Sequence, residues 1–393
     1  MHLKNLGVLY GKNLEYRHST NLQITNHLFG QIHGAPKSEK TIDCEGLLLI
    51  PGFVNAHTHI GDSIAKDATT GGTVDDKIHP ILGAKRRILR ESEPEHLVSF
   101  MRNACLSMLR KGITTFADFR ESELAGVLLL KKAISQTSIR AIILGRIEYY
   151  QDQDQIRKNT PLPVSQRKKL LDVLRSCDGL GISGANENSN SVLQSMSKTK
   201  KIRAIHSAET IESSLKSKKM TGKSETSRAL LLKPHFLVHM TYAKQGDLCT
   251  AAKKTRGIVI CPRANASLAE GIPDFTLMEK NGCRVAIGTD NVMINSPDMF
   301  REMDYLWKAT MGIHKKRIDP KEILKMATVN GGILLGKKIG SIEPRYLADG
   351  IFINKHALDL EPMHNPYASI VHRASESTIK AVMIGGRIIH GKL

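Results

Sequence analysis

The sequence predicts an α/β protein, a (β/α)₈ TIM-type barrel with a small β-sandwich domain built from both chain ends. The 393 residues, 41% of them hydrophobic, suffice for one large barrel and a minor second unit. Between residues 51 and 340, short apolar runs alternate with helical patterns, which is typical of βαβ units. Strand-like runs separated by turns make up 1–50 and 341–393. We therefore predict a β domain from 1–50 and 341–393 around a barrel at 51–340.

Eight segments of the central region are predicted barrel strands. They are residues 47–59, 112–120, 139–148, 179–186, 202–209, 235–242, 257–265 and 284–291. The intervening segment 95–112 has apolar residues at helical spacing and ends in a glycine, which favours a helix C-terminus. Eight such alternations over about 250 residues match the size of a (β/α)₈ barrel.

The net charge of +19 could attract nucleic acid, anionic lipid or an anionic substrate. The basic stretches 197–203 and 214–228 contain no aromatic residue and no recognisable nucleic-acid module. The low aromatic content, 5%, also argues against a surface on which bases stack. We expect no specific nucleic-acid partner and interpret the charge as a solvated surface.

The sequence favours the cytoplasm. The N-terminal stretch is interrupted by charges and does not resemble a signal peptide, and no apolar run is long enough to span a bilayer. We therefore expect no membrane partner. The six cysteines are scattered without a C-x-x-C pair, which argues against a disulfide framework or a thiolate zinc site.

The first predicted strand ends in PGFVNAHTH, with His57 and His59 two residues apart. On an extended chain both side chains point to the same side, here the barrel interior. Loops at this end of the strands form the active face of such barrels. Two neutral imidazoles there can chelate one divalent ion, although a pair of hydrogen-bonded loop histidines is the alternative.

Three more predicted strands end in residues of the same kinds. The fifth provides His206, followed by Glu209, the sixth provides His239, and the eighth provides Asp290. A lone histidine at such a place is often structural, and an aspartate after a strand often caps a helix. Their coincidence at one face predicts a shared metal site. Imidazole and carboxylate ligands suit Zn²⁺ or Fe²⁺ better than Mg²⁺ or Ca²⁺.

We expect one divalent ion, zinc first and iron as the alternative. The end of the fourth strand, GLGISGAN, has no lysine that could be modified to bridge two ions.

Together these motifs resemble the amidohydrolase superfamily, in particular its cytosine, guanine and adenosine-type aminohydrolase branch, which also holds triazine hydrolases. The resemblance rests on PGFVNAHTH, GITTFAD, HSAE, CPRAN, GTDN and ATVNGGILLGKKIGSIEP, and it covers nearly the whole chain. It implies that His57, His59, His206 and Asp290 hold the metal. It also implies that Glu209 and His239 are catalytic without being primarily bound to the metal, and that the protein is a homo-oligomer.

Two stretches depart from the family pattern. EPRYLAD stands where Pro-Gly-Lys-x-Ala-Asp is usual, in the predicted β domain, and GDSIAKD follows the H-x-H pair. Because of the second, the identity of the substrate does not follow from the resemblance.

The expected activity is that of a hydrolase acting on C–N bonds other than peptide bonds. A bound metal supplies hydroxide near neutral pH, and Asp290 takes the proton of the water. Glu209 protonates a ring nitrogen, and His239 either stabilises the charge that develops on the attacking oxygen or holds a polar group of the substrate. We predict a deaminase that releases ammonia from an aminated heterocycle such as a nucleobase or nucleoside.

Other functions stay open at this point. Hydrolysis of a cyclic amide, an imidazolone or a triazine uses the same metal site and differs in whether ammonia is released. Two alternatives are not enzymes: a scaffold protein that keeps the barrel but has lost its catalytic activity, and a nucleic-acid-binding protein, which is suggested by the net charge alone.

Five further residues at predicted strand ends are candidate substrate contacts. Arg120, Arg146 and Arg263 can each bind a carboxylate or phosphate through two hydrogen bonds, or pair instead with nearby acidic residues. Asn265 and Asn291 can add hydrogen bonds to the substrate. An anionic substituent on the substrate is therefore a further hypothesis.

Overall fold

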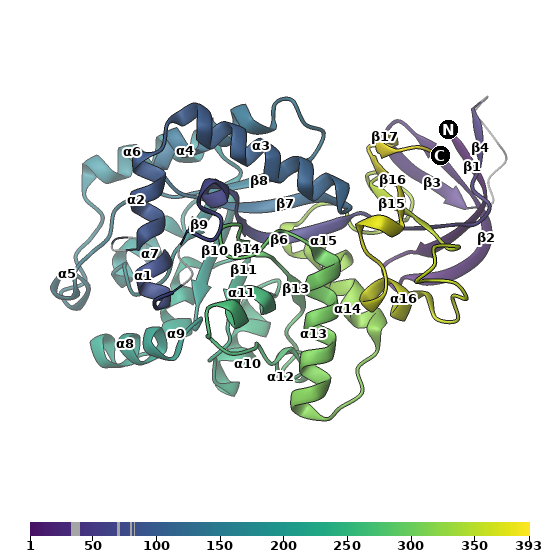
Figure 1. Ribbon diagram of the computed structural model, residues 1–393. Coiled ribbons are helices and arrows are strands. Elements are labelled where there is room, and N and C mark those ends of the chain that lie inside the picture. The colour runs from purple at the N-terminus through teal and green to yellow at the C-terminus, as the bar shows by residue number, and fades with distance from the viewer. Residues whose placement is uncertain (33–39, 69–70, 79–80, 82) are drawn as a thin grey trace.

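The computed structural model describes residues 1–32, 40–68, 71–78, 81 and 83–393. Two sheets organise this part of the chain: a parallel sheet surrounded by helices, and a second sheet, at one end of the molecule, that contains both termini (Figure 1).

The parallel sheet runs in the order β13-β12-β11-β10-β9-β8-β7-β6-β14, and all its paired strands are parallel. Its strands are β6 (Phe53–His59), β7 (Ile113–Arg120), β8 (Arg140–Gly145), β9 (Gly179–Ile182), β10 (Ile202–Ser207), β11 (Phe236–His239), β12 (Ile258–Ile260), β13 (Val285–Ile287) and β14 (Asp290–Asn291). Every residue of β6 and β7 is buried, because the outer face is covered by helices and the inner face by the other strands. Each of the eight predicted segments thus contains a parallel strand.

The chain segment that contains β13 and β14 pairs with strands from both ends of this sheet. β13 pairs with β12, whereas β14, which begins three residues after β13 ends, pairs with β6. At the crossing, the Gly288 N–H donates to the Ile260 carbonyl, and the Thr289 N–H donates to the His57 carbonyl. A Cβ on Gly288 would lie 2.7 Å from the Cβ of His57, so only glycine fits there. The chain is an α/β fold with a curled parallel sheet, consistent with a TIM-type barrel.

Helices surround the parallel sheet (Figure 1). The helices and 3₁₀ turns (η) are η1 (Ile60–Ala65), α1 (Val74–Ile78), α2 (Ala84–Glu91), α3 (Pro94–Arg110), α4 (Glu123–Ile134), α5 (Gln153–Arg157), α6 (Val164–Ser176), α7 (Asn190–Met196), α8 (Ile211–Thr221), α9 (Glu225–Ala229), η2 (Leu230–Leu232), α10 (Gln245–Lys254), α11 (Pro262–Ser267), α12 (Phe275–Lys280), α13 (Met299–His314), α14 (Pro320–Ala327), α15 (Val329–Leu335), α16 (Pro366–His372) and η3 (Glu376–Thr378). The predicted helix at 95–112 is confirmed as α3. It starts with a proline at its first position, and Gly112, at φ 79°, follows its end.

The second sheet combines both ends of the chain, in the order β17-β16-β15-β5-β1-β2-β3, with β4 beside β1 (Figure 1). Its strands are β1 (His2–Tyr10), β2 (Glu15–Thr25), β3 (Leu28–Ile32), β4 (Thr41–Asp43), β5 (Leu47–Pro51), β15 (Gly350–Asn354), β16 (Ile379–Ile384) and β17 (Arg387–Gly391). Apolar side chains from both ends share one core there, for example Leu6, Leu49 and Phe352.

The extent of two predicted strands was wrong. Segment 47–59 is two strands in two sheets, because β5 pairs with β1 and β15 whereas β6 belongs to the parallel sheet. In segment 257–265 the strand ends at Ile260, and Pro262 starts α11.

All six cysteines are free. None of the helices in the described part of the chain combines the length and apolar character that a membrane crossing requires.

Candidate metal centre

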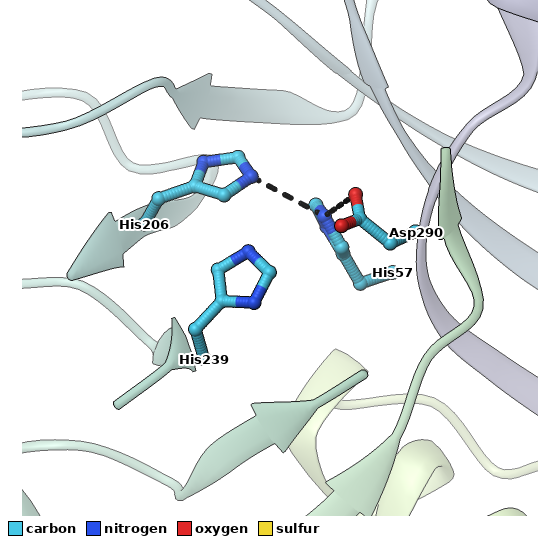
Figure 2. A group of neighbouring side chains, drawn as sticks. All are labelled: His57, His206, His239 and Asp290. Carbon is cyan, nitrogen blue, oxygen red and sulfur yellow. Dashed lines mark hydrogen bonds and ion pairs between the residues drawn. The ribbon is translucent and has the colours of Figure 1, made fainter. Parts of the chain in front are cut away.

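Four buried side chains converge where strands of the parallel sheet end. His57 comes from β6, His206 from β10, His239 from β11 and Asp290 from β14 (Figure 2). One ligand atom of each lies within 4.8 Å of the others. His57 Nε2 is 3.2 Å from both Asp290 Oδ1 and His206 Nε2. This His/His/His/Asp group can hold a divalent metal ion.

His59, also on β6, approaches the same point. Its Nε2 lies 3.4 Å from His206 Nε2 and 3.6 Å from Asp290 Oδ1. The Nδ1 of His59 faces Glu121 Oε1 at 2.8 Å, and the Nδ1 of His206 faces the Ile182 carbonyl at 2.9 Å. Both Nδ1 atoms therefore donate, and two Nε2 lone pairs face each other, an arrangement that a cation between them stabilises.

The spacing of these atoms fits a metal. The Nε2 atoms of His57, His59 and His206 and Oδ1 of Asp290 include separations of 3.2, 3.4 and 3.6 Å. Ligands at zinc bond lengths of about 2.0–2.2 Å in a tetrahedron lie roughly 3.3–3.6 Å apart. These separations among the four predicted ligands suit a metal, whereas the group whose ligand atoms all lie within 4.8 Å of one another contains His239 in place of His59.

Burial sets the charge of the cluster. It lowers the pKa of His57, and it lowers the pKa of His206 well below its ordinary value. Burial and the positive charge of Lys85 lower the pKa of His59 to about 3. Burial alone would raise the pKa of Asp290, but the hydrogen bond from His57 and the adjacent imidazoles lower it by more. Neutral imidazoles beside an ionised carboxylate are the protonation state that metal binding requires.

The metal-free protein is expected to lose stability as the pH falls from about 6.5 toward 3, because the buried imidazoles take up protons only on unfolding. The folded pKa of His59, about 3, lies below the unfolded value, so this stability is fully present above about pH 6.5. Urea unfolding at several pH values in a chelator checks it. His59→Asn should reduce the pH slope, whereas His18→Asn, at an exposed position, should not. An unchanged slope in His59→Asn would contradict the assignment.

The backbone is strained at two residues of the cluster. His239 has φ 70° and Asp290 has φ 57°, in the left-handed region that residues with a Cβ rarely adopt. Such strain persists only where the surroundings hold it, and it concentrates at functional sites. Here it lets two strand ends aim their side chains at one point.

Glu209 lies beside the cluster, just after β10. Its Oε2 is 3.5 Å from His239 Nε2. Burial raises the pKa of the Glu209 carboxyl, and His239 opposes the rise. On its other side, His239 Nδ1 lies 3.2 Å from Asn265 Oδ1. Glu209 is thus a carboxyl group that can carry a proton close to the metal centre.

A cavity of about 140 Å³ opens onto the cluster. His59, His206, Glu209, His239 and Asp290 form its inner wall. Of the five predicted substrate contacts, Arg146 and Asn291 line it, together with Lys85, Asn186 and Ser213.

The other three predicted contacts lie outside the described wall of the cavity. Arg120 pairs with Asp118 and Glu121. Arg263 pairs with Glu302. Asn265 binds His239 and donates to Thr241 Oγ1 at 3.1 Å. Arg146 also pairs with an acidic residue, because its Nη2 lies 3.6 Å from Glu121 Oε1. Pairing with nearby acidic residues, the alternative left open for the arginines, is therefore found for all three, and Arg146 differs in also lining the cavity.

Lys85 is a cavity residue that sequence reasoning missed. It lies on α2, is buried, and its Nζ is 2.6 Å from Glu121 Oε1 and 3.3 Å from Asp62 Oδ2. Asp62 also accepts from Asn291 Nδ2 at 2.7 Å, which ties the chain after β6 to β14. Lys85 belongs to the basic segment AKRRILRE, in which a lysine is expected to be exposed to solvent. No local feature of the sequence distinguishes it from the neighbouring basic residues.

Glu121→Gln is expected to lower the free energy of unfolding by about 3–5 kcal/mol, because removing one charge of a buried ionic cluster leaves its partners uncompensated. Glu121 is buried and contacts Lys85, Arg120 and His59. Urea unfolding checks the loss. The control is Glu95→Gln, whose exposed pair with Lys132 should cost less than about 1 kcal/mol. Equal losses of unfolding free energy in Glu121→Gln and Glu95→Gln would contradict the stabilising role of Glu121 in the buried ionic cluster.

Comparisons with known proteins agree with these features. Residues 48–389 match the Amidohydrolase family. A putative aminohydrolase of Methanothermobacter thermautotrophicus is 38% identical over 90% of each chain. A 5-methylthioadenosine/S-adenosylhomocysteine deaminase of Acetivibrio thermocellus is 29% identical over 90% of this chain and 83% of that one. The zinc complex of atrazine chlorohydrolase from Arthrobacter aurescens TC1 has a similar fold, with a TM-score of 0.85 and 16% identity over 99% of this chain and 95% of that chain.

Proposed function

Because this chain belongs to the amidohydrolase family, we propose that it is a metal-dependent hydrolytic deaminase, which releases ammonia from an aminated heterocycle such as a nucleobase, a nucleoside or a related compound. The observation that carries the proposal is the position of Glu209, a partly buried carboxyl group of raised pKa beside the cluster of histidines and Asp290. The relative named as a deaminase supports it.

His57, His59, His206 and Asp290 are the proposed metal ligands. Zinc is the proposed ion, with iron as the alternative, because nitrogen ligands dominate the set. When bound, such an ion lowers the pKa of a water molecule and so supplies hydroxide near neutral pH. The zinc complex with a similar fold supports this choice.

Proton movements are assigned to two carboxyl groups whose environments push their pKa values apart. Asp290 is ionised, and its Oδ2 has no hydrogen-bond partner among the described residues, so it can accept the proton of the water. Glu209, whose pKa burial raises, is the proposed donor of a proton to a ring nitrogen, which makes the adjacent carbon electrophilic. Asp290 then passes its proton to the amine, which leaves as ammonia, and the remaining hydroxyl proton returns to Glu209 as the carbonyl forms, so that both carboxyl groups regain their starting state.

His239 is proposed to orient the attacking oxygen. Its Nδ1 is engaged by Asn265, so Nε2 is the atom that faces Glu209 and the ligand cluster. An imidazole fixed in this way can stabilise charge that develops at that point during the reaction.

Arg146 and Asn291 are the substrate contacts that we retain, because both line the cavity. Both Nε and Nη1 of Arg146 lack a hydrogen-bond partner among the described residues. An anionic substituent on the substrate therefore stays part of the proposal.

The organisation of the chain completes the proposal: a closed (β/α)₈ barrel at 51–340 carries the chemistry, and a small β-sandwich domain is formed by 1–50 and 341–393. We also propose a cytoplasmic homo-oligomer. Six free cysteines are consistent with a reducing compartment.

The test is ammonia release by the zinc-loaded protein from aminated pyrimidines, purines, pterins and nucleosides, each with and without a phosphate or carboxylate. Release from one member supports deamination. Hydrolysis of cyclic amides, imidazolones or triazines without any ammonia-releasing substrate would instead establish the alternative reaction on the same site.

A further inference from the structure

Arg263 donates two hydrogen bonds to one buried carboxyl group, that of Glu302. It lies near the start of α11, and its backbone N–H donates to Glu302 Oε2 at 3.2 Å. Its Nη1 donates to Glu302 Oε1 at 3.3 Å. Glu302, on α13, is 0% exposed, and the Arg263 side chain is 15% exposed. The start of α11 is therefore fixed to α13.

The guanidinium of Arg263 also reaches the chain that follows Asp290. Nη1 donates to the Ser296 carbonyl and Nη2 to Asn295 Oδ1, both at 3.3 Å. The Asn295 N–H in turn donates to the Asn291 carbonyl at 3.1 Å. Arg263 thus joins α11 to the loop after β14, which carries Asp290.

Asn265, two residues after Arg263, connects α11 to His239. Its Oδ1 accepts from His239 Nδ1 at 3.2 Å, while its Nδ2 donates to Thr241 Oγ1 at 3.1 Å. Asn265 is 1% exposed. A short helix thus carries both the side chain that orients His239 and the side chain that holds the Asp290 loop.

We infer that Arg263 is a positioning residue, which holds α11 so that Asn265 keeps His239 in place relative to Asp290. The inference rests on the proposed function, in which His239 and Asp290 act on the same oxygen. It differs from substrate binding, because Arg263 lies outside the described cavity wall. Displacement of a catalytic group by about 1 Å can cost 10²-fold in rate, so loss of the link should lower turnover.

The kinetic test compares Arg263→Met with a matched control, Arg284→Met, in the zinc-loaded protein. Arg284 has a long hydrogen bond of 3.4 Å to the Arg256 carbonyl at an exposed site. We expect Arg263→Met to lower kcat by about 10- to 100-fold with KM changed less than threefold, since binding is separate from positioning. Arg263→Lys, which keeps the charge beside Glu302, should recover part of kcat. Arg284→Met should leave both unchanged.

Two results would overturn the inference. A steep rise in KM for an anionic substrate with unchanged kcat would make Arg263 a binding residue. Unchanged kcat and KM would remove it from the site altogether. If Arg263→Met is too unstable to purify, Asn265→Ala replaces it, with the same expected split between kcat and KM.

A second readout does not depend on activity. In ¹⁵N-histidine-labelled, zinc-loaded protein, the ring proton on Nδ1 of His239 should give a protected NMR signal that Asn265→Ala removes. Arg263→Met should shift it and Arg284→Met should not; an unshifted signal in Arg263→Met contradicts the inference. If the wild type shows the protected His239 signal and Arg263→Met shifts it, but no substrate releases ammonia, only the proposed function is rejected. If ammonia is released, but Arg263→Met neither shifts the signal nor lowers kcat, only the positioning role of Arg263 is rejected.

Discussion

Glu209→Gln is expected to lower kcat for ammonia release by about 10²- to 10⁴-fold, the usual contribution of a positioned acid. Glutamine keeps the shape of the side chain but has no proton to give to a ring nitrogen. Burial raises the pKa of Glu209, which favours the protonated form of the wild-type carboxyl. Steady-state kinetics on the best substrate of the panel measures the loss.

Measuring the zinc bound per chain distinguishes loss of the acid from damage to the metal centre. Since Glu209 is outside the proposed ligand set, Glu209→Gln should retain about as much zinc as the wild type. Glu212→Gln is the matched control, because Glu212 is exposed on α8, three residues further along the chain. Normal turnover in Glu209→Gln would exclude it as the acid.

Asp290→Asn is expected to abolish turnover by removing two functions at once. The variant loses the proposed charged metal ligand, and it loses the group proposed to accept the proton of the water. Replacing groups that only support metal ligands already costs about 10- to 100-fold in metal affinity, so loss of a charged ligand should cost more. Asp290 is 2% exposed, and its Oδ1 lies within 3.6 Å of two histidine nitrogens.

Metal analysis after dialysis against a weak chelator checks this expectation. Asp290→Asn should lose zinc under conditions in which the wild type and Asp359→Asn, an exposed control, retain it. Retention of one zinc ion per chain with normal kcat would contradict both roles of Asp290.

The position of the metal centre could be predicted from sequence because it depends on a regular feature of the fold. Parallel strands end at the same edge of the sheet, so residues that follow them, such as His57, His206 and Asp290, meet there even though they are far apart in the chain. Periodicity places the strands well enough for this purpose. The step from β13 to β14 at Gly288, which brings Asp290 next to β6, has no such regular signal.

The wall of the cavity was harder to predict because it depends on tertiary pairing. Arg120, Arg146 and Arg263 are alike in sequence, each following an apolar run, yet only Arg146 lines the cavity. Arg263 is turned to Glu302, 39 residues later, and Lys85 is turned inward by Asp62 and Glu121. Which partner a charged residue chooses depends on contacts between distant segments, and these leave no periodic pattern.

Ammonia release as a function of zinc bound per chain tests the central claim most directly. Metal-free protein, given zinc in substoichiometric steps, should gain activity in proportion to bound zinc and reach its maximum at one ion per chain. Full activity without metal, or activity that begins only after a first equivalent has bound, would contradict a deaminase built on the single centre of His57, His59, His206 and Asp290.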